Sequence, residues 1–212
     1  MTLTSQSARD ISRQLFFDNG GKIHYIHLDG FGSQYTASPA DELQWKRELI
    51  DIYRKRLTEE TNATVLAGIA ENLRYHGAEG MKEMLVQRYV VGPIEVKIAA
   101  AYACWKGLEE EVGAMLLTDL WKKADAHNRK EIRSHLNFMR SSRSVQEWVI
   151  QALSGNDREM FDEVVDLLQI WKALNVSSFK GAARISQLKS MSRDDERFPN
   201  IIAETIKAIR KG

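Results

Sequence analysis

Residues 65–77 read VLAGIAENLRYHG, and residues 96–107 read VKIAAAYACWKG. Both segments begin with valine, carry small residues in the middle and place an aromatic residue two positions before a glycine. A second amphipathic segment follows each of them and contains a Met-Leu pair, which begins at Met84 and at Met115. The two blocks are offset by about 31 residues, within the range of helical-hairpin repeats. The sequence therefore predicts a repeated pair of helices.

Apolar residues recur at helical spacing through the rest of the chain. The clearest stripe joins Phe161, Val164, Val165, Leu168 and Trp171. Helices are expected over residues 39–57, 63–75, 80–90, 94–106, 109–123, 128–140, 144–153, 157–174, 178–190 and 198–210. The joints between these segments are short, and short joints make successive helices run antiparallel. The expected fold class is therefore all-α.

The prolines support these helix boundaries. Pro39, Pro93 and Pro199 each stand where a helix is expected to begin, where the missing N–H of proline costs nothing. Ser38 precedes Pro39 as a capping residue, and Asp41 places a carboxylate at the positive end of the helix dipole.

The first part of the chain has a different pattern. We expect residues 1–37 to form an N-terminal segment ahead of a helical domain over residues 38–212. Residues 14–17 and 22–28 predict a small β-hairpin, because the Asn-Gly pair at residues 19–20 tolerates the positive φ of tight turns.

A helix over residues 8–17 competes with this hairpin, because Ile11 and Leu15 would share one of its faces. The choice also affects two histidines. In a strand His24 and His27 lie on opposite faces, whereas in a helix they are neighbours. Neither arrangement supplies an evident third metal ligand.

The repeated blocks resemble HEAT repeats, whose first helix often carries a valine, then a pair of small residues, then an aliphatic residue. The matching residues are Val96 with Ala99 and Ala100, and Val65 with Gly68 and Ile69. The resemblance covers about residues 60–150, and a partial match at residues 145–153 lacks the small pair. It implies a short α-α superhelix of stacked antiparallel hairpins, in which small residues let helices approach closely. An irregular helical bundle is the alternative.

Composition and charge narrow the function classes. The 212 residues are 43% hydrophobic, and 30 basic against 29 acidic side chains leave a net charge of +1, so no global field favours nucleic acid or an anionic membrane. The single cysteine, Cys104, has no disulfide partner and is expected to be an inert core thiol in a reducing compartment. The apolar stretch at residues 98–105 is far shorter than the roughly 20 residues of a membrane span. The first ten residues are polar, so a cytoplasmic location is expected.

No set of reactive residues converges in the sequence. His127 and His135 are too far apart to share one cation directly, and His76 is expected to cap the end of a helix. Glutamates 109–111 are explained by the dipole at a helix start, and the acids of residues 157–166 are expected to form a solvated helix face. Glycine-rich phosphate loops, hydrolase elbows and zinc-protease motifs are absent. We therefore expect no metal and no cofactor, and no motif identifies a catalytic residue.

The charge distribution is the main irregularity. Residues 118–143 hold seven basic against three acidic side chains, and residues 177–193 hold four basic side chains and no acid. If residues one repeat apart align, the two segments form one basic stripe. Arg129, Arg133 and Arg140 are expected on one helical side. The predicted partner-binding set is Lys122, Lys123, Arg129, Lys130, Arg133, Arg140, Arg143 and Arg184.

Three interpretations of this stripe stay open: a solvated surface, a site for an acidic protein, or a site for nucleic acid. The leading hypothesis is a non-enzymatic module that binds another protein through a solenoid surface. The alternative is a nucleic-acid-binding protein, including an enzyme resembling the HEAT-like alkylpurine DNA glycosylases, which pair a basic groove with aromatic and acidic residues. The tryptophans, Trp105, Trp121, Trp148 and Trp171, are expected in the core, and Trp45 is the least certain of the five.

Overall fold

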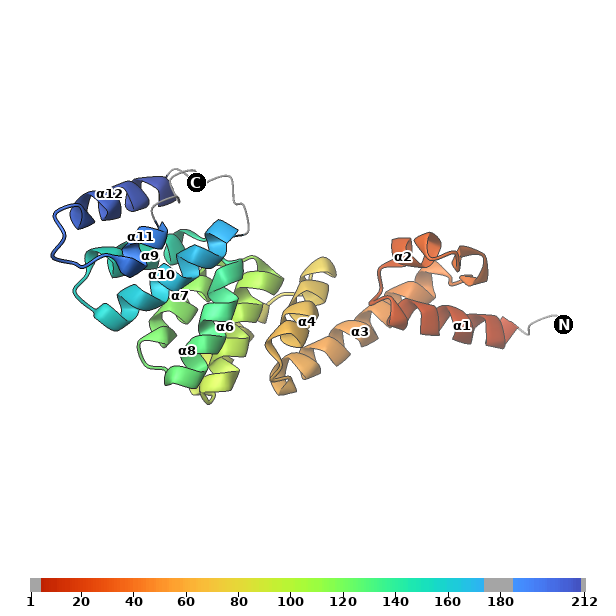
Figure 1. Cartoon of the computed structure of the whole chain (residues 1–212). Helices are drawn as coiled ribbons and strands as arrows, with labels where there is room; N and C mark the ends of the chain where they lie inside the picture. Colours follow the sequence, from red (N-terminus) through yellow and green to blue (C-terminus); the bar gives the residue numbers. More distant parts are fainter. Residues whose placement is uncertain (1–4, 174–184, 211–212) are drawn as a thin grey trace.

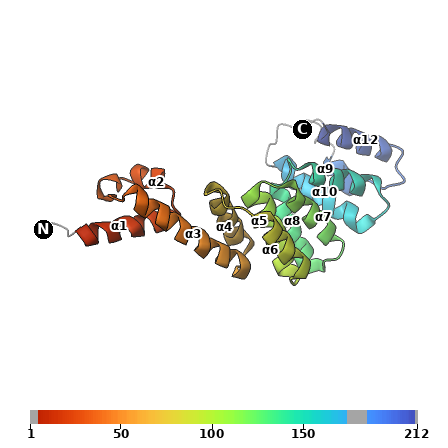
Figure 2. The ribbon, with the colours of Figure 1, turned by 180° about the vertical axis from the view of Figure 1, so that it is seen from behind.

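The computed structural model describes residues 5–173 and 185–210, and all regular structure in these ranges is helical. The all-α prediction is therefore confirmed. An elongated molecule results, with an arm of α1 to α3 at one end and α12 at the other (Figures 1 and 2). The elements are α1 (Ser5–Asp18), α2 (Ile23–Leu28), the 3-10 turn η1 (Gly32–Gln34), α3 (Pro39–Glu59), α4 (Ala63–Tyr75), α5 (Met81–Val91), α6 (Ile94–Leu108), α7 (Glu111–Trp121), α8 (Ala126–Phe138), α9 (Arg143–Ser154), α10 (Arg158–Ala173), α11 (Ile185–Ser190) and α12 (Phe198–Ile209).

The helix boundaries follow the capping signals in the sequence. Ser38 and Asp41 form a reciprocal capping box at the start of α3, with Pro39 in its first turn. Side chains of Asn62, Asp125 and Ser142 cap α4, α8 and α9 by accepting hydrogen bonds from backbone N–H groups of the first turn. The helices expected between residues 39 and 174 are all present with ends shifted by a few residues. Of the segment expected over residues 178–190, only its end, α11, lies within the described residues.

The predicted N-terminal β-hairpin is wrong, because residues 14–17 lie in α1 and residues 23–28 form α2. The competing helix over residues 8–17 is correct. In the helix α1, Phe16 is buried against Trp45 and Leu49 of α3. An isolated two-stranded hairpin is at best marginally stable in water. Gly20 and Gly21 have positive φ angles, and they form the turn between α1 and α2.

Polar contacts hold the helices of the arm together and join the arm to the end of α4. Arg9 pairs with Asp41 at 2.7 Å, and Arg13 pairs with Glu48 at 2.8 Å, both between α1 and α3. A buried hydrogen bond joins Nε2 of His76, just after α4, to the backbone oxygen of Gly20 at 2.7 Å. Three parts of the chain, the turn after α1, α3 and the end of α4, thus meet at one junction.

Small residues pack the middle of the molecule tightly. Ala99, Ala100 and Ala103 of α6 are buried in a core shared with Leu66 and Ala67 of α4, as expected for small residues in the middle of the repeated block. Gly68 does not contribute to this approach, because the space where its side chain would lie is open. Close approach is needed at two glycines that the sequence comparison did not assign to this task, Gly107 and Gly113.

The tryptophans are mostly core residues. Trp45, Trp121, Trp148 and Trp171 are buried, whereas Trp105 is only partly buried. Cys104 is also buried, and burial, followed by the charge of Glu110, raises the pKa of its thiol to about 11. A thiol held protonated in a core is a weak nucleophile, which agrees with the prediction of an inert thiol.

Polar side chains link helices that lie about one predicted repeat apart. Arg88 of α5 donates to the backbone oxygens of Leu57 and Glu60, and the Tyr89 hydroxyl donates to Leu116 O at 3.2 Å. The Glu111 carboxylate accepts hydrogen bonds from the Ser142 hydroxyl at 2.6 Å and from the Ser144 N–H at 2.7 Å. These contacts join residues 27 to 33 positions apart.

Candidate functional site

The structure separates the predicted basic stripe into exposed and paired residues. Within residues 5–173 and 185–210, the exposed members that form no ion pair are Lys122, Lys123, Lys130 and Arg140, which we call the exposed basic set. Arg143 is exposed but pairs with Glu147 at 2.8 Å, one turn along α9. It also lines a cavity of about 360 Å³ with Arg210. Arg184 lies outside the described residues.

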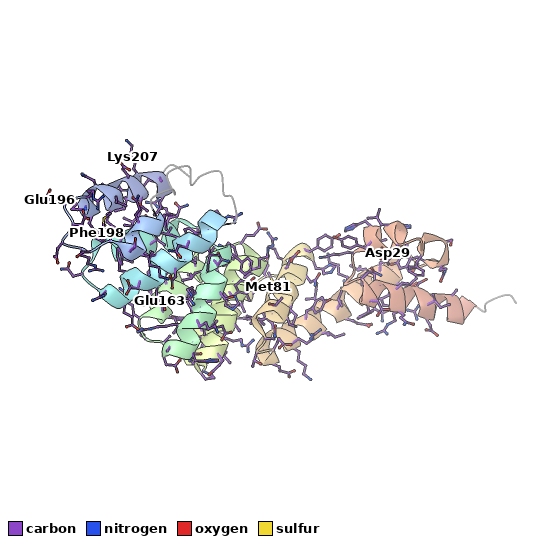
Figure 3. The ribbon with its side chains drawn as sticks, in the orientation of Figure 1. Asp29, Met81, Glu163, Glu196, Phe198 and Lys207 are labelled. Atoms are coloured by element: carbon purple, nitrogen blue, oxygen red, sulfur yellow. The ribbon has the colours of Figure 1, made fainter. Side chains whose placement is uncertain are left out.

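The two central arginines of the stripe are bound to α10. Arg133 lies 2.9 Å from Glu163 and 3.8 Å from Asp166, and Arg129 pairs with Glu159. Glu163 of α10 is labelled in Figure 3. Three of the acids expected to form a solvated face, Glu159, Glu163 and Asp166, are therefore partners of α8, whereas Asp157 and Asp162 are exposed as expected. Half-buried ion pairs of this kind leave little of either arginine for an external phosphate.

Two further contacts fix the positions of the arginines. The Arg129 guanidinium lies 4.4 Å from the ring centroid of Trp121, and its Nε donates to Trp121 O at 3.2 Å. Arg140 lies beyond the end of α8, which stops at Phe138. The expectation that Arg129, Arg133 and Arg140 share one side of a helix is therefore wrong.

Replacement of Arg133 tests whether these pairs hold α8 to α10. We expect Arg133→Glu to lower the free energy of unfolding by about 2 kcal/mol, because it places a third carboxylate beside Glu163 and Asp166. Adding Glu163→Arg should restore most of that loss. Urea unfolding followed by circular dichroism measures both changes.

The matched control is Lys130→Glu, which reverses an exposed and unpaired charge on the same helix and should change stability by less than about 0.5 kcal/mol. Two results would contradict the role of the ion pairs: a loss of stability for Lys130→Glu as large as that for Arg133→Glu, or no recovery of stability in the Arg133→Glu/Glu163→Arg variant. Either would show that stability depends on the overall charge of the helix and not on these pairs.

The histidines are dispersed over the molecule. His24 and His27 lie in α2, not in a strand, and in the described part of the chain no three His, Cys, Asp or Glu residues are grouped so as to hold a metal ion. His135 of α8 stacks on Tyr102 of α6, with ring centroids 4.2 Å apart. Burial lowers the pKa of His135 to about 4.

His76 follows the last turn of α4, but the prediction that its side chain caps this helix is wrong, because the imidazole bonds to Gly20 O in the arm. Burial, with smaller contributions from the nearby charges of Lys46 and Lys22, lowers the pKa of His76, and the hydrogen bond to Gly20 O opposes this. At neutral pH the imidazole is therefore a neutral donor that holds the turn after α1. A side chain at Gly21 would lie 2.7 Å from the His76 ring, so this turn needs glycine.

Beside His76 the three parts of the chain line a pocket of about 440 Å³ that is open to solvent, and we call it the junction pocket. Figure 3 shows side chains of the arm and of α4 that point into the region between them. Apolar residues form much of the pocket wall, and Glu42 and Lys46 add charge. The residues that line it are Phe16, Gly21, Ile23, Pro39, Glu42, Leu43, Lys46, Tyr75 and His76.

Aromatic and cationic side chains surround the junction pocket. Tyr75 is 53% exposed, Leu43 is 53% exposed and Tyr25 is 44% exposed. The Lys22 ammonium lies 5.3 Å from the ring centroid of Tyr75 and 5.9 Å from that of Tyr25. Lys46 is half-buried and forms no ion pair with any residue that the structure describes. Exposed aromatic side chains of this kind are enriched at protein interfaces, and a lysine ammonium over a tyrosine ring is a favourable cation–π contact.

The sequence did contain one signal for this pocket. Pro39, Glu42, Leu43 and Lys46 follow helical spacing along α3, on a different face from Trp45 and Leu49. A second partly apolar face on one helix indicates a second contact surface. The predicted hairpin obscured it, because strands would place Phe16 and Ile23 elsewhere.

Among the described helices, none is long and apolar enough to cross a membrane. Comparisons with known proteins gave no match: no family model fits the chain, and no curated protein or solved structure is similar to it.

Proposed function

We propose that the chain is a non-enzymatic interaction module, a short HEAT-like stack of helical hairpins that binds another protein. Regular spacing supports the stack. The helices α4, α6, α8 and α10 begin at residues 63, 94, 126 and 158, so successive starts are 31, 32 and 32 residues apart. The polar links between neighbouring pairs, such as Arg133 to Glu163, span about the same distance in sequence. Such stacks are stabilised by contacts between adjacent repeats and leave extended surfaces for partners.

The junction pocket is the observation that carries the proposal of protein binding. It combines a concave apolar wall with exposed Tyr25, Leu43 and Tyr75 on its edge. Tyrosine is enriched among the residues that dominate binding energy at protein interfaces, and the half-buried lysines beside it can add polar contacts.

The alternative of nucleic-acid binding has weaker support. Among the described members of the predicted stripe, Arg129 and Arg133 are engaged by α10 and Arg143 by Glu147, which leaves the exposed basic set to contact phosphates. The net charge of +1 also provides little long-range attraction to a polyanion. The cytoplasmic location and the role of the exposed basic set remain predictions.

An affinity capture followed by reconstitution tests the proposal. The full chain is immobilised, proteins retained from a lysate of the native host are identified, and each is purified and titrated by calorimetry. We expect a retained protein to bind the wild-type chain and to lose at least about tenfold in affinity with Tyr75→Ala. The Lys122→Glu/Lys130→Glu variant is the control for the other surface.

The result distinguishes the two functions. Equal affinity of every purified candidate for wild type and Tyr75→Ala contradicts docking at the junction pocket. Duplex DNA binding that falls steeply with salt, and that Lys122→Glu/Lys130→Glu weakens, supports the nucleic-acid alternative instead.

A further inference from the structure

We propose that the junction pocket recognises an acidic peptide segment that carries an aromatic or aliphatic anchor residue. This inference rests on the proposed function and adds the chemistry of the partner. It depends on three features of the pocket: its apolar wall, its unpaired lysines and its exposed aromatic edge.

The apolar wall requires an apolar group in the ligand. Phe16, Ile23 and Leu43 line the cavity together with the Tyr75 ring. A volume of about 440 Å³ lies within the usual range for sites that enclose a bound group. Burial of one large apolar side chain here removes the exposed area of Leu43 and Tyr75 from water, which favours binding.

The charges around the cavity favour an acidic ligand. Lys46 lines the pocket, Lys22 lies over Tyr75, and no carboxylate of the described chain pairs with either ammonium. The one acid in the lining, Glu42, accepts a hydrogen bond from the Tyr35 hydroxyl at 3.0 Å. Glu42 keeps its negative charge, but the two ammonium groups of Lys46 and Lys22 outnumber this one carboxylate, so these three groups carry a net positive charge. A carboxylate of the ligand would pair with Lys46 in a partly desolvated site, where such a pair is stronger than at an open surface.

The exposed edge extends beyond the cavity and favours a peptide over a compact small molecule. Tyr25 does not line the cavity, yet it is 44% exposed and shares Lys22 with Tyr75. His24 adds a further ring, 4.1 Å from Tyr25 and 6.3 Å from Tyr75. A peptide that buries one anchor in the pocket can continue along this row of rings and place its acids beside both lysines.

Selection from a library of random 12-residue peptides tests the specificity directly. The full chain serves as bait, and the Lys46→Glu/Tyr75→Ala variant removes peptides that bind elsewhere. We expect the remaining peptides to share one aromatic or aliphatic residue flanked by two or more acids. Enrichment of neutral or basic peptides overturns the inference. So does a selection in which no enriched peptide depends on Lys46 and Tyr75 for binding.

Fluorescence anisotropy of a labelled selected peptide then measures each contribution. We expect Tyr75→Ala and Lys46→Glu each to weaken binding at least about tenfold, and replacement of the peptide's acids by their amides to do the same. The matched controls are Phe138→Ala, which removes a ring that is 64% exposed at the end of α8, and Lys123→Glu. Both should bind within about twofold of wild type, and circular dichroism verifies that all variants are folded.

The two proposals fail in different ways. In one outcome, a purified native partner binds in a way that depends on Tyr75, but the chain shows no preference for acidic peptides. This outcome supports the proposed function and contradicts the acidic specificity. A labelled oligothymidine that binds the wild-type chain and is lost with Tyr75→Ala assigns the pocket to nucleic acid and removes both.

Discussion

The Gly113→Ala variant is expected to lose about 2 kcal/mol or more of its free energy of unfolding. A side chain at this position of α7 would lie 2.4 Å from both Ala101 O and Trp105 N, which are backbone atoms of α6. Backbone atoms inside a packed helix cannot move aside alone, so the two helices must separate. The helix propensity of alanine returns at most about 1 kcal/mol, which the steric cost exceeds.

Gly107→Ala should have a similar effect through a different contact, because its side chain would lie 2.5 Å from Ala67 O of α4. Gly68→Ala is the matched control. Gly68 lies inside α4 with nothing near its missing side chain, so alanine should stabilise the chain by about 0.5–1 kcal/mol. Urea unfolding followed by circular dichroism compares the three variants. Stabilisation by all three would show that α6 does not approach α4 and α7 as closely as described.

These glycines show what the sequence can predict. Helical periodicity located α3 to α10 within a few residues, because a buried stripe repeats every turn whatever the helix packs against. The role of each glycine depends on the face that meets a neighbour. Gly77 and Gly107 align in the repeated blocks, yet Gly77 has a φ of +70° after α4, whereas Gly107 lies within α6. The corresponding left-handed position after α6 is occupied by Glu109.

The candidate surfaces were harder to predict, because they are formed by distant segments. A count of charges within residues 118–143 cannot show that an acidic helix 30 positions later neutralises Arg129 and Arg133. Repeat alignment of the basic segments predicted a stripe, whereas an offset of 30 residues between bases and acids pairs Arg129 with Glu159 and Arg133 with Glu163. The junction pocket depends on the position of the arm, which an Asn-Gly pair with short apolar flanks does not determine.

Acidification should reveal the burial of His135. Between pH 7 and pH 4 the free energy of unfolding of the wild-type chain is expected to fall by about 2–3 kcal/mol more than that of His135→Phe. The folded pKa of His135 is about 4, below its ordinary value of 6.5, because burial penalises the charged ring. The unfolded chain therefore takes up a proton first as the pH falls. The contribution of the neutral ring to stability is complete above about pH 6.5 and is lost as the pH approaches 4.

The surroundings of His135 offer little to stabilise a proton. No residue in the described ranges accepts a hydrogen bond from its buried Nε2, and Glu131 Oε1 lies 3.9 Å away, beyond hydrogen-bond distance. The Tyr102 ring, at a centroid distance of 4.2 Å, can stack equally well on phenylalanine. His127→Gln, an exposed change on the same helix, should keep the wild-type dependence on pH. If His135→Phe keeps it as well, His135 is not the buried neutral ring described above, and the loss of stability in acid arises from carboxylates.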